Sequence, residues 1–302
     1  MPELPEVETI RRGLDKFCVH QKIRKVKILC EKSFIGPAEL VEGKEITRLR
    51  RFGKALVIDL GGGVSMMVHL RMTGQLIYRG SGTEKGVDAA QAKLLTKQSF
   101  AGGHPTDSFF TELPNKQTRV IFELDSGTLF FNDQRKFGFC KVLPTAEVEQ
   151  DKFIKSLAKE PWKMEASELY QKLQRRKNSP IKAVILDQKV ICGLGNIYAD
   201  EALFGARIHP RTLAGKLSLE QVKKLIRCAC EVMDASIKSG GSTMATYVRA
   251  DGTKGDYLEL FAKVFRREGQ PCVNCGNEII KIRVAGRGTH ICPHCQKECK
   301  ND

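Results

Sequence analysis

The stretch SPIKAVILDQKVICGLGNIYADEALFGA, residues 179–206, carries the most information about the fold. Its first part, with Ile181, Val184, Ile185 and Gln188 on one face, has a helical period that stops at the glycines of residues 193–195. A second helical period begins at Asn196 and runs to residue 206. Glycines between two helices allow a tight turn, and the start of the second helix presents N–H groups that suit a phosphate. Glycine also serves close packing at such junctions, so the residues alone leave both interpretations open.

Downstream of this junction, two Cys-x-x-Cys pairs indicate a metal site. Cys272 and Cys275 form the first pair and Cys292 and Cys295 the second, with residues 276–291 between them. This spacing is typical of a four-cysteine zinc site, although disulfides or a redox pair are the alternatives. Four thiolates complete a tetrahedral shell, so we predict one structural Zn²⁺ and interpret His290, His294 and Cys299 as bystanders.

The segment between the two cysteine pairs has the pattern of a β-hairpin. Ile280, Ile282 and Val284 alternate with polar residues, and residues 285–288 read as a turn with Arg287 at its tip. A guanidinium on a rigid turn suits a phosphate or a base edge, whereas the plain alternative is a solvated turn residue.

Upstream, the N-terminal half reads as one helix followed by strands. Apolar residues at 7, 10, 14 and 17 make a helical stripe, with Pro5 in the first turn. Apolar runs at 26–29, 55–60 and 64–70 predict antiparallel strands, and residues 119–124 and 128–131 predict a hairpin. The polar stretch 80–114 predicts a long surface loop.

The sequence turns helical after about Leu143. Ser218 and Gln221 form a capping box before a further amphipathic helix. The Gly- and Ser-rich stretch 240–255 that follows is predicted to be mobile.

Composition narrows the class of protein. The 302 residues are enough for two domains, and 50 Lys and Arg against 35 Asp and Glu give a net charge of +15, which favours a nucleic-acid partner. No run approaches the ~18 apolar residues of a membrane span, and the acidic start does not resemble a secretory signal. We therefore expect a cytoplasmic protein, without a membrane partner, whose eleven cysteines are reduced thiols or metal ligands.

Three motifs in a fixed order connect these observations. They are PELPEVET at residues 2–9, LDQ followed by GLGNIYADEALF within residues 186–204, and the four-cysteine hairpin. Together they resemble the formamidopyrimidine-DNA glycosylase family over nearly the whole chain. The resemblance implies an α+β fold: an N-terminal antiparallel β-sandwich with flanking helices, then a helical helix-two-turn-helix domain that ends in a four-cysteine zinc-finger β-hairpin.

The resemblance also implies how the domains divide and what they bind. We expect a catalytic domain at residues 1–143, a helical domain with a lesion-capping loop (residues 240–257) at 153–262, and a zinc finger at 263–302. Damaged double-stranded DNA would lie in the cleft between the domains. The protein would act as a monomer associated with the bacterial nucleoid.

A catalytic mechanism follows from the same resemblance. Removal of Met1 would leave the secondary amine of Pro2 as the nucleophile that attacks the sugar of a flipped nucleotide. An ordinary α-amine has a pKa of about 7.7–8.0, which leaves a useful unprotonated fraction near neutrality. Glu3 matches the acid/base carboxylate and Glu6 a supporting acid, although both also suit the helix dipole. Lys54 matches the lysine that grips a phosphate beside the lesion.

Six further residues match DNA-contacting positions of the family. Met72, Arg135 and Phe137 match the group that fills the gap left by a flipped base. Lys182, Asn196 and Arg287 match phosphate contacts. Met and Phe beside strands are more often core residues, so without the resemblance we would assign these two to packing.

Two departures from the family pattern stand out. Gln134 and Lys136 replace a proline and an arginine in the Asp-Pro-Arg-Arg-Phe motif, and lysine lacks the planar fork of arginine. The connection at residues 80–114 is about 20 residues longer than the family pattern leads us to expect.

The expected activity is excision of oxidised purines (8-oxoguanine and formamidopyrimidines) through a Schiff base on Pro2, with β,δ-elimination that nicks the strand at the abasic site. Two alternatives are a related glycosylase for oxidised pyrimidines and a non-catalytic zinc-finger DNA-binding protein. Leu4 argues against the first, because that class typically has glycine there. Pro2, Glu3 and Lys54 argue against the second, because a binding protein needs no free N-terminal proline.

Overall fold

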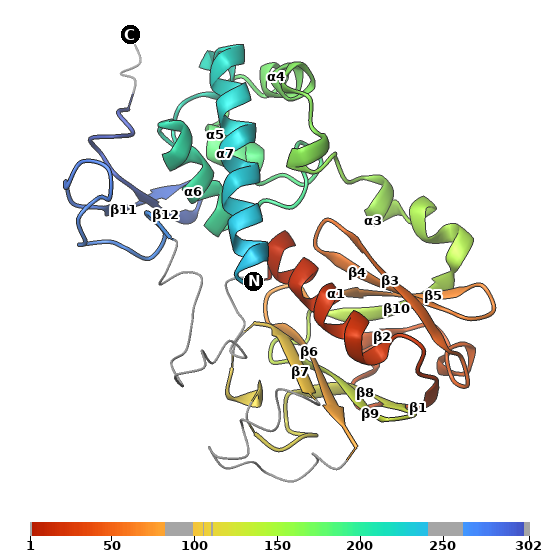
Figure 1. The fold of residues 1–302 in the computed structure, drawn as a ribbon. Helices are drawn as coiled ribbons and strands as arrows, with labels where there is room; N and C mark the ends of the chain where they lie inside the picture. The colour runs from red at the N-terminus through yellow and green to blue at the C-terminus, as the bar shows by residue number, and fades with distance from the viewer. Residues whose placement is uncertain (1, 82–98, 105, 110, 241–261, 299–302) are drawn as a thin grey trace. The chain divides into compact units, whose positions relative to one another are not determined.

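The computed structural model describes residues 2–81, 99–104, 106–109, 111–240 and 262–298 (Figure 1). They fall into two compact units. The N-terminal unit runs to Lys155, and the C-terminal unit combines residues 156–239 with the described residues from 262 onward. Within these ranges, no helix is long and apolar enough to cross a membrane.

The N-terminal unit is a sandwich of two five-stranded sheets (Figure 1). Neighbouring strands are antiparallel, except that β10 and β2 are parallel. The first sheet has the order β1 (Ile23–Ile28), β8 (Thr118–Leu124), β9 (Gly127–Asp133), β6 (Gly74–Gly80) and β7 (Ser99–Gly103). The second has the order β2 (Phe34–Ile35), β10 (Phe139–Pro144), β5 (Val64–His69), β4 (Ala55–Leu60) and β3 (Ile46–Phe52).

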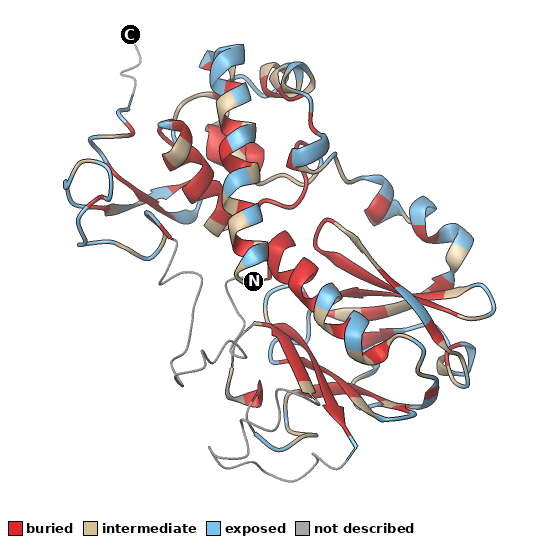
Figure 2. Ribbon diagram, viewed as in Figure 1, coloured by how far each residue is buried: buried red, intermediate tan, exposed pale blue. Residues whose placement is uncertain are grey.

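One apolar core joins both sheets to helix α1 (Leu4–Cys18) (Figure 2). The predicted stripe of α1 is confirmed, since Val7, Ile10 and Leu14 are buried, with Phe17 packed at the edge. Burying such side chains contributes about 1.5–3 kcal/mol each. Short 3-10 segments and one helical turn complete this unit: η1 (Glu31–Ser33), η2 (Ala38–Leu40), η3 (Asp107–Phe109), η4 (Thr145–Gln150) and α3 (Lys152–Lys155).

The prediction of one long loop over residues 80–114 is wrong in part. Strand β7 lies inside this range and pairs with β6. Its glycines hid it from a sequence pattern that looks for β-branched and aromatic residues. They are needed because α1 lies close: a Cβ on Gly102 would stand 2.5 Å from Ile10 Cγ1, and one on Gly13 would stand 2.1 Å from the Phe100 ring. Residues 82–98 lie outside the described ranges.

The C-terminal unit begins with helices. They are η5 (Pro161–Lys163), α4 (Ala166–Gln174), α5 (Ile181–Ile185), α6 (Asn196–Ala206), η6 (Ala214–Lys216) and α7 (Leu219–Lys238). The capping box of Ser218 and Gln221 at the start of α7 is confirmed. The second helix of the glycine junction starts at Asn196, as predicted, but the first helix, α5, ends before Gln188. The predicted mobile stretch and lesion-capping loop, residues 240–257, lie outside the described residues except for Gly240.

A two-stranded hairpin, β11 (Ile280–Val284) and β12 (Arg287–Ile291), follows. Its turn is only Ala285 and Gly286, both with positive φ, which is the tight hairpin turn whose twist matches the strands. Arg287 therefore begins the second strand rather than occupying the middle of a wider turn. Phe204 of α6 packs with Val264, Ile279 and the buried cysteines, so the finger shares a core with the helices.

The α+β fold class, with a β-sandwich followed by a helical region and a four-cysteine hairpin, is confirmed. The division into three domains stays a prediction.

Candidate functional site

Pro2 and Glu3 lie directly before α1, and the start of that helix fixes their backbone. Glu3 is the N-cap residue, and its N–H donates to Glu6 Oε2 at 2.8 Å within a reciprocal capping box. Pro2, Glu3 and Glu6 are all buried. A capping box satisfies N–H groups that a helix start would otherwise leave unpaired. Glu6 thus has a helix-start role, and its support of catalysis stays a prediction.

Lys54 lies in the two-residue turn between β3 and β4, and an arginine braces that turn. Arg51 donates to Gly53 O at 3.0 Å and to Glu8 Oε2 of α1 at 3.1 Å. Burial raises the pKa of Glu8, but hydrogen bonds from Arg11, Arg12 and Arg51 outweigh it and lower the pKa to about 2. The Glu8 carboxylate therefore ties the turn that carries Lys54 to the helix that begins at Glu3.

His69, at the end of β5, was not predicted as a functional residue, yet it lies beside this turn. It pairs with Ala55, the residue after Lys54, and Nδ1 accepts the Arg71 N–H at 3.0 Å. Burial, together with the charges of Arg71 and Lys54, lowers its pKa to about 3. The imidazole is therefore neutral near pH 7 and carries its proton on Nε2. The missed signal is a lone histidine that ends a buried strand.

The three residues predicted to fill the gap of a flipped base lie on two loops that contact each other. Met72, 41% exposed, follows β5, and Arg135 and Phe137, the latter 55% exposed, follow β9. The Arg135 guanidinium lies 4.8 Å from the centre of the Phe137 ring, and the Arg135 N–H donates to Thr73 Oγ1 at 3.1 Å. The two exposed apolar side chains therefore lie on adjoining loops, where they are available for contact with a partner.

In the C-terminal unit, Lys182 and Asn196 both donate to the finger. The Lys182 ammonium contacts Gly288 O at 3.1 Å, Thr289 Oγ1 at 2.7 Å and Asp200 Oδ1 at 2.6 Å, and the side chain is fully buried. Asn196 Nδ2 donates to Gly288 O at 3.0 Å. The first two contacts are hydrogen bonds and the third is an ion pair with the buried Asp200 carboxylate, so the ammonium is held inside the protein. The phosphate contact of Lys182 stays a prediction that requires this group to change partners.

Arg287 is exposed at the tip of the finger, next to the carbonyl that Lys182 and Asn196 hold. The three residues predicted to contact phosphates therefore converge on the start of β12. The glycine junction is also braced, because Gln188 donates to Leu186 O at 2.9 Å and Leu194 O at 3.0 Å and accepts the Gly193 N–H at 2.9 Å.

Two acidic residues of α6 were not recognised from the sequence. Asp200 pairs with Lys182 and accepts the His290 N–H at 3.0 Å. Glu201 accepts N–H groups of Lys263, Val264 and Phe265 at 2.8–3.1 Å, although burial raises its pKa. The sequence signal for Asp200 and Glu201 is two adjacent acids in the otherwise apolar helix that follows the glycine junction. Both tie the finger to α6.

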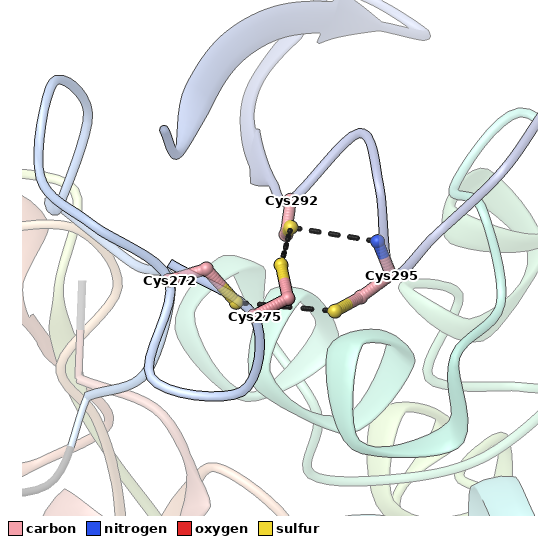
Figure 3. A group of neighbouring side chains, drawn as sticks. All are labelled: Cys272, Cys275, Cys292 and Cys295. Atoms are coloured by element: carbon pink, nitrogen blue, oxygen red, sulfur yellow. Dashed lines mark hydrogen bonds between the residues drawn. The ribbon is translucent and has the colours of Figure 1, made fainter. Parts of the chain in front are cut away.

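The four predicted zinc ligands come together (Figure 3). Their sulfur atoms all lie within 4.8 Å of one another, with Cys275 Sγ and Cys292 Sγ 3.5 Å apart and Cys272 Sγ and Cys295 Sγ 3.9 Å apart. Zinc–sulfur bonds of about 2.3 Å in a tetrahedron place the sulfurs about 3.8 Å apart. A disulfide needs about 2.05 Å. The donor set fits one structural Zn²⁺.

Comparison with known proteins identifies the same family that the sequence motifs resemble. Residues 1–140 match the formamidopyrimidine-DNA glycosylase N-terminal domain, residues 157–248 its H2TH domain, and residues 269–297 the zinc finger found in FPG and IleRS. Formamidopyrimidine-DNA glycosylases of Pelotomaculum thermopropionicum and Desulfitobacterium hafniense are 38% and 37% identical to the chain, covering 98% of it and 99% and 100% of the relatives.

Solved structures agree. The Lactococcus lactis protein in complex with abasic-site DNA matches with a TM-score of 0.81 at 31% identity, covering 98% of this chain and 100% of that one. The complex of the same bacterium's protein with Fapy-dG DNA matches with a TM-score of 0.81 at 30% identity and the same coverage.

The sandwich, the glycine junction and the four-cysteine finger define the class of zinc-finger DNA-repair glycosylases. Within that class, the chain belongs to the formamidopyrimidine-DNA glycosylase family.

Proposed function

We propose that this glycosylase excises oxidised purines from duplex DNA with the amine of Pro2 and then nicks the strand at the abasic site. The observation that carries the proposal is the fixed start of α1. Pro2 is buried directly before Glu3, whose backbone is held by the Glu6 capping box. Removal of Met1 would leave a secondary amine one residue before a carboxyl group, the pair that this proposal uses for nucleophilic attack and proton transfer.

The proposed chemistry balances with these two groups. The Pro2 nitrogen bonds to C1′ as the glycosidic bond breaks, and the departing base takes a proton from an acid such as Glu3. The proton of the new ammonium passes to O4′ as the C1′–O4′ bond opens, which leaves an iminium ion. Loss of a C2′ proton then expels the 3′ phosphate, and loss of a C4′ proton expels the 5′ phosphate. Water releases the amine.

The remaining residues have supporting roles in this proposal. Lys54, on a turn braced by Arg51, binds a phosphate beside the lesion. Met72, Arg135 and Phe137 fill the space of the flipped nucleotide. Arg287 and Asn196 bind phosphates at the finger. Complexes of the Lactococcus lactis relative with abasic-site and Fapy-dG DNA support damaged duplex DNA as the ligand.

Borohydride trapping on an 8-oxoguanine:cytosine duplex tests the nucleophile. We expect the protein with a free Pro2 amine to form a covalent complex, and the same protein with a blocked N-terminus to form none, because a blocked amine cannot make an iminium. Pro2→Gly keeps an amine and is expected to trap weakly. Absence of trapping by zinc-loaded, DNA-binding protein would rule out this mechanism for this lesion.

Comparing Glu3→Gln with Glu6→Gln tests whether Glu3 is the acid that protonates the departing base. Removing a general acid or base costs about 10²–10⁴-fold in rate. We expect Glu3→Gln to bind the lesion duplex normally and lose excision on this scale, measured in single turnovers. Repeating the series with oxidised pyrimidines separates the purine enzyme from its alternative: faster excision of pyrimidines would overturn the proposed substrate class.

A further inference from the structure

One buried carboxylate holds both loops that carry Met72, Arg135 and Phe137. Asp133, at the end of β9, is fully buried. Its Oδ1 accepts the Arg135 N–H at 3.1 Å, and its Oδ2 accepts the N–H groups of Phe137 at 2.8 Å and Gly138 at 2.6 Å. Thr73, the residue after Met72, donates its hydroxyl to Oδ1. The donors thus come from two loops that are far apart in sequence.

The backbone of Asp133 is fixed as well. Its N–H donates to Gln117 O at 2.9 Å, and its carbonyl accepts from Arg119 Nε at 2.7 Å. Asp133 also pairs with Gly74 at the start of β6, directly after Thr73. The carboxylate therefore stands on a rigid strand pair from which both loops emerge. Neither loop can shift relative to this strand pair without leaving a buried oxygen or N–H group unpaired.

These hydrogen bonds hold the loops that carry Met72 and Phe137. The two side chains are exposed, so their own burial does little to hold the loops in place. Met72 and Phe137 are 41% and 55% exposed. A group that must enter a base stack loses less entropy on binding if its loop is ordered beforehand. The Asp133 carboxylate lies below the loops and orders their backbone. The side chains at the loop tips therefore remain available to contact DNA.

We propose that Asp133 is a positioning residue that holds the Met72 loop and the Arg135–Phe137 loop as one body, so that the three side chains enter the duplex together. This inference rests on the proposed function, since it assumes that these side chains fill the space of a flipped base. Thr73 is the link that transmits the coupling between the loops.

Thr73→Val and Thr73→Ser test the link while keeping the Asp133 carboxylate itself. Valine keeps the shape and removes the hydroxyl, whereas serine keeps the hydroxyl. We expect Thr73→Val to lower single-turnover excision from an 8-oxoguanine:cytosine duplex about fivefold or more, and Thr73→Ser to stay within about twofold of the unchanged protein. The same lesion inside a mismatched bubble is already unstacked, so the Thr73→Val defect there should shrink to about twofold or less.

A second readout follows the wedge directly. With 2-aminopurine beside the lesion, the fluorescence rise on binding reports unstacking, and we expect Thr73→Val to slow it in parallel with excision. Asp133→Asn should give a larger defect of the same kind, and adding Thr73→Val to it should change little, because the two act as one unit. Asp59→Asn is the matched control: Asp59 is a buried carboxylate paired with Arg50 and Ser65, and its loss should lower the melting temperature without affecting unstacking.

The outcomes separate the two proposals. Normal excision and unstacking by Thr73→Val would overturn the coupling role, and so would a defect of equal size in duplex and bubble. If the unchanged protein neither traps nor excises, the proposed function fails instead, and this is seen before any variant is compared.

Discussion

Two surfaces of this glycosylase are held in place by opposite charges. In the N-terminal unit, the anion Asp133 collects N–H and O–H donors from the loops of Met72, Arg135 and Phe137. In the C-terminal unit, the cation Lys182 donates to Gly288 O and Thr289 Oγ1 beside Arg287. The first has neutral partners, whereas the second also needs the counter-charge of Asp200 at 2.6 Å.

The difference follows from what each turn offers. The loop after β9 turns its N–H groups inward, so a carboxylate is satisfied by neutral donors. The start of β12 presents the Gly288 carbonyl and the Thr289 hydroxyl, so the matching group is an ammonium, and its full burial requires an anion nearby. The finger also relies on four cysteines that fit one zinc ion. The two surfaces should therefore be disrupted by different substitutions: loss of hydrogen-bond donors in the N-terminal unit, and loss of zinc or of a charge partner in the C-terminal unit.

The largest effect is expected from loss of zinc. Cys272→Ser, or removal of the metal by a chelator, should unfold the finger and weaken duplex binding about 100-fold or more, because the structural metal supplies most of the folding free energy of such a module. Fluorescence anisotropy measures the binding. Cys30→Ser, a half-buried cysteine outside the cluster, is the matched control. Unchanged binding after verified zinc loss would show that the finger stands without its metal.

The next effect concerns Lys182. Lys182→Met leaves Asp200 buried without its partner, which costs about 3–5 kcal/mol in comparable pairs. Urea unfolding of the C-terminal unit, followed by Trp162 fluorescence, measures it. If Lys182 contacts a phosphate as predicted, Lys182→Met in an Arg287→Ala background should reduce the salt dependence of DNA binding by about one further unit. An unchanged salt dependence would instead show that the ammonium keeps its partners inside the protein.

A smaller effect tests another buried anion of the N-terminal unit, Glu8. Its folded pKa of about 2 lies below its ordinary value of 4.5, so the stabilisation is present above pH 4.5 and is lost as the pH falls toward 2. Allowing for solvent screening, we expect about 1–2 kcal/mol at pH 7. Glu8→Gln should be less stable than the unchanged protein at pH 7, and the two should converge near pH 2. A constant difference in urea unfolding across this range would contradict the assignment.

The smallest effect separates the partners of Glu8. Arg12 is 57% exposed at its side chain, whereas the Arg51 side chain is 12% exposed. Exposed ion pairs contribute about 0.2–1 kcal/mol, so Arg12→Ala should lower the free energy of unfolding by no more than that. Arg51→Met should cost more and also slow excision, because it releases the turn of Lys54. Equal effects of the two variants on stability and excision would remove the bracing role from Arg51.

Much of the fold was predictable from local patterns. The stripe of α1, the capping box of α7 and the cysteine spacing are signals within a few residues of one another, and the structure confirms them. Strand β7 was missed because close packing by α1 requires glycines where a strand pattern would have branched residues. That requirement comes from a helix about 90 residues earlier, which no local pattern records.

The residues of the candidate site also fall into two groups: those that local motifs predict and those whose partners only the folded chain brings near. The predicted roles of Pro2, Glu3 and Met72 rest on the motifs in which these residues lie. Asp133, Asp200 and His69 stand inside or next to those motifs, but their roles depend on partners that only the folded chain brings near. A carboxylate in a motif reads as a surface charge until its burial is known. Burial and hydrogen-bond partners were therefore what the sequence could not supply.

The pairing of β6 with β7 has a practical consequence. Because Arg79 pairs with Ser99, the two ends of the connection between these strands stand next to each other. The closure cost of a loop rises only about 0.6 kcal/mol for each doubling of its length. The sheet is thus only weakly affected by how many residues join the two strands, so a label or an affinity tag inserted in this connection should leave helix α1 undisturbed.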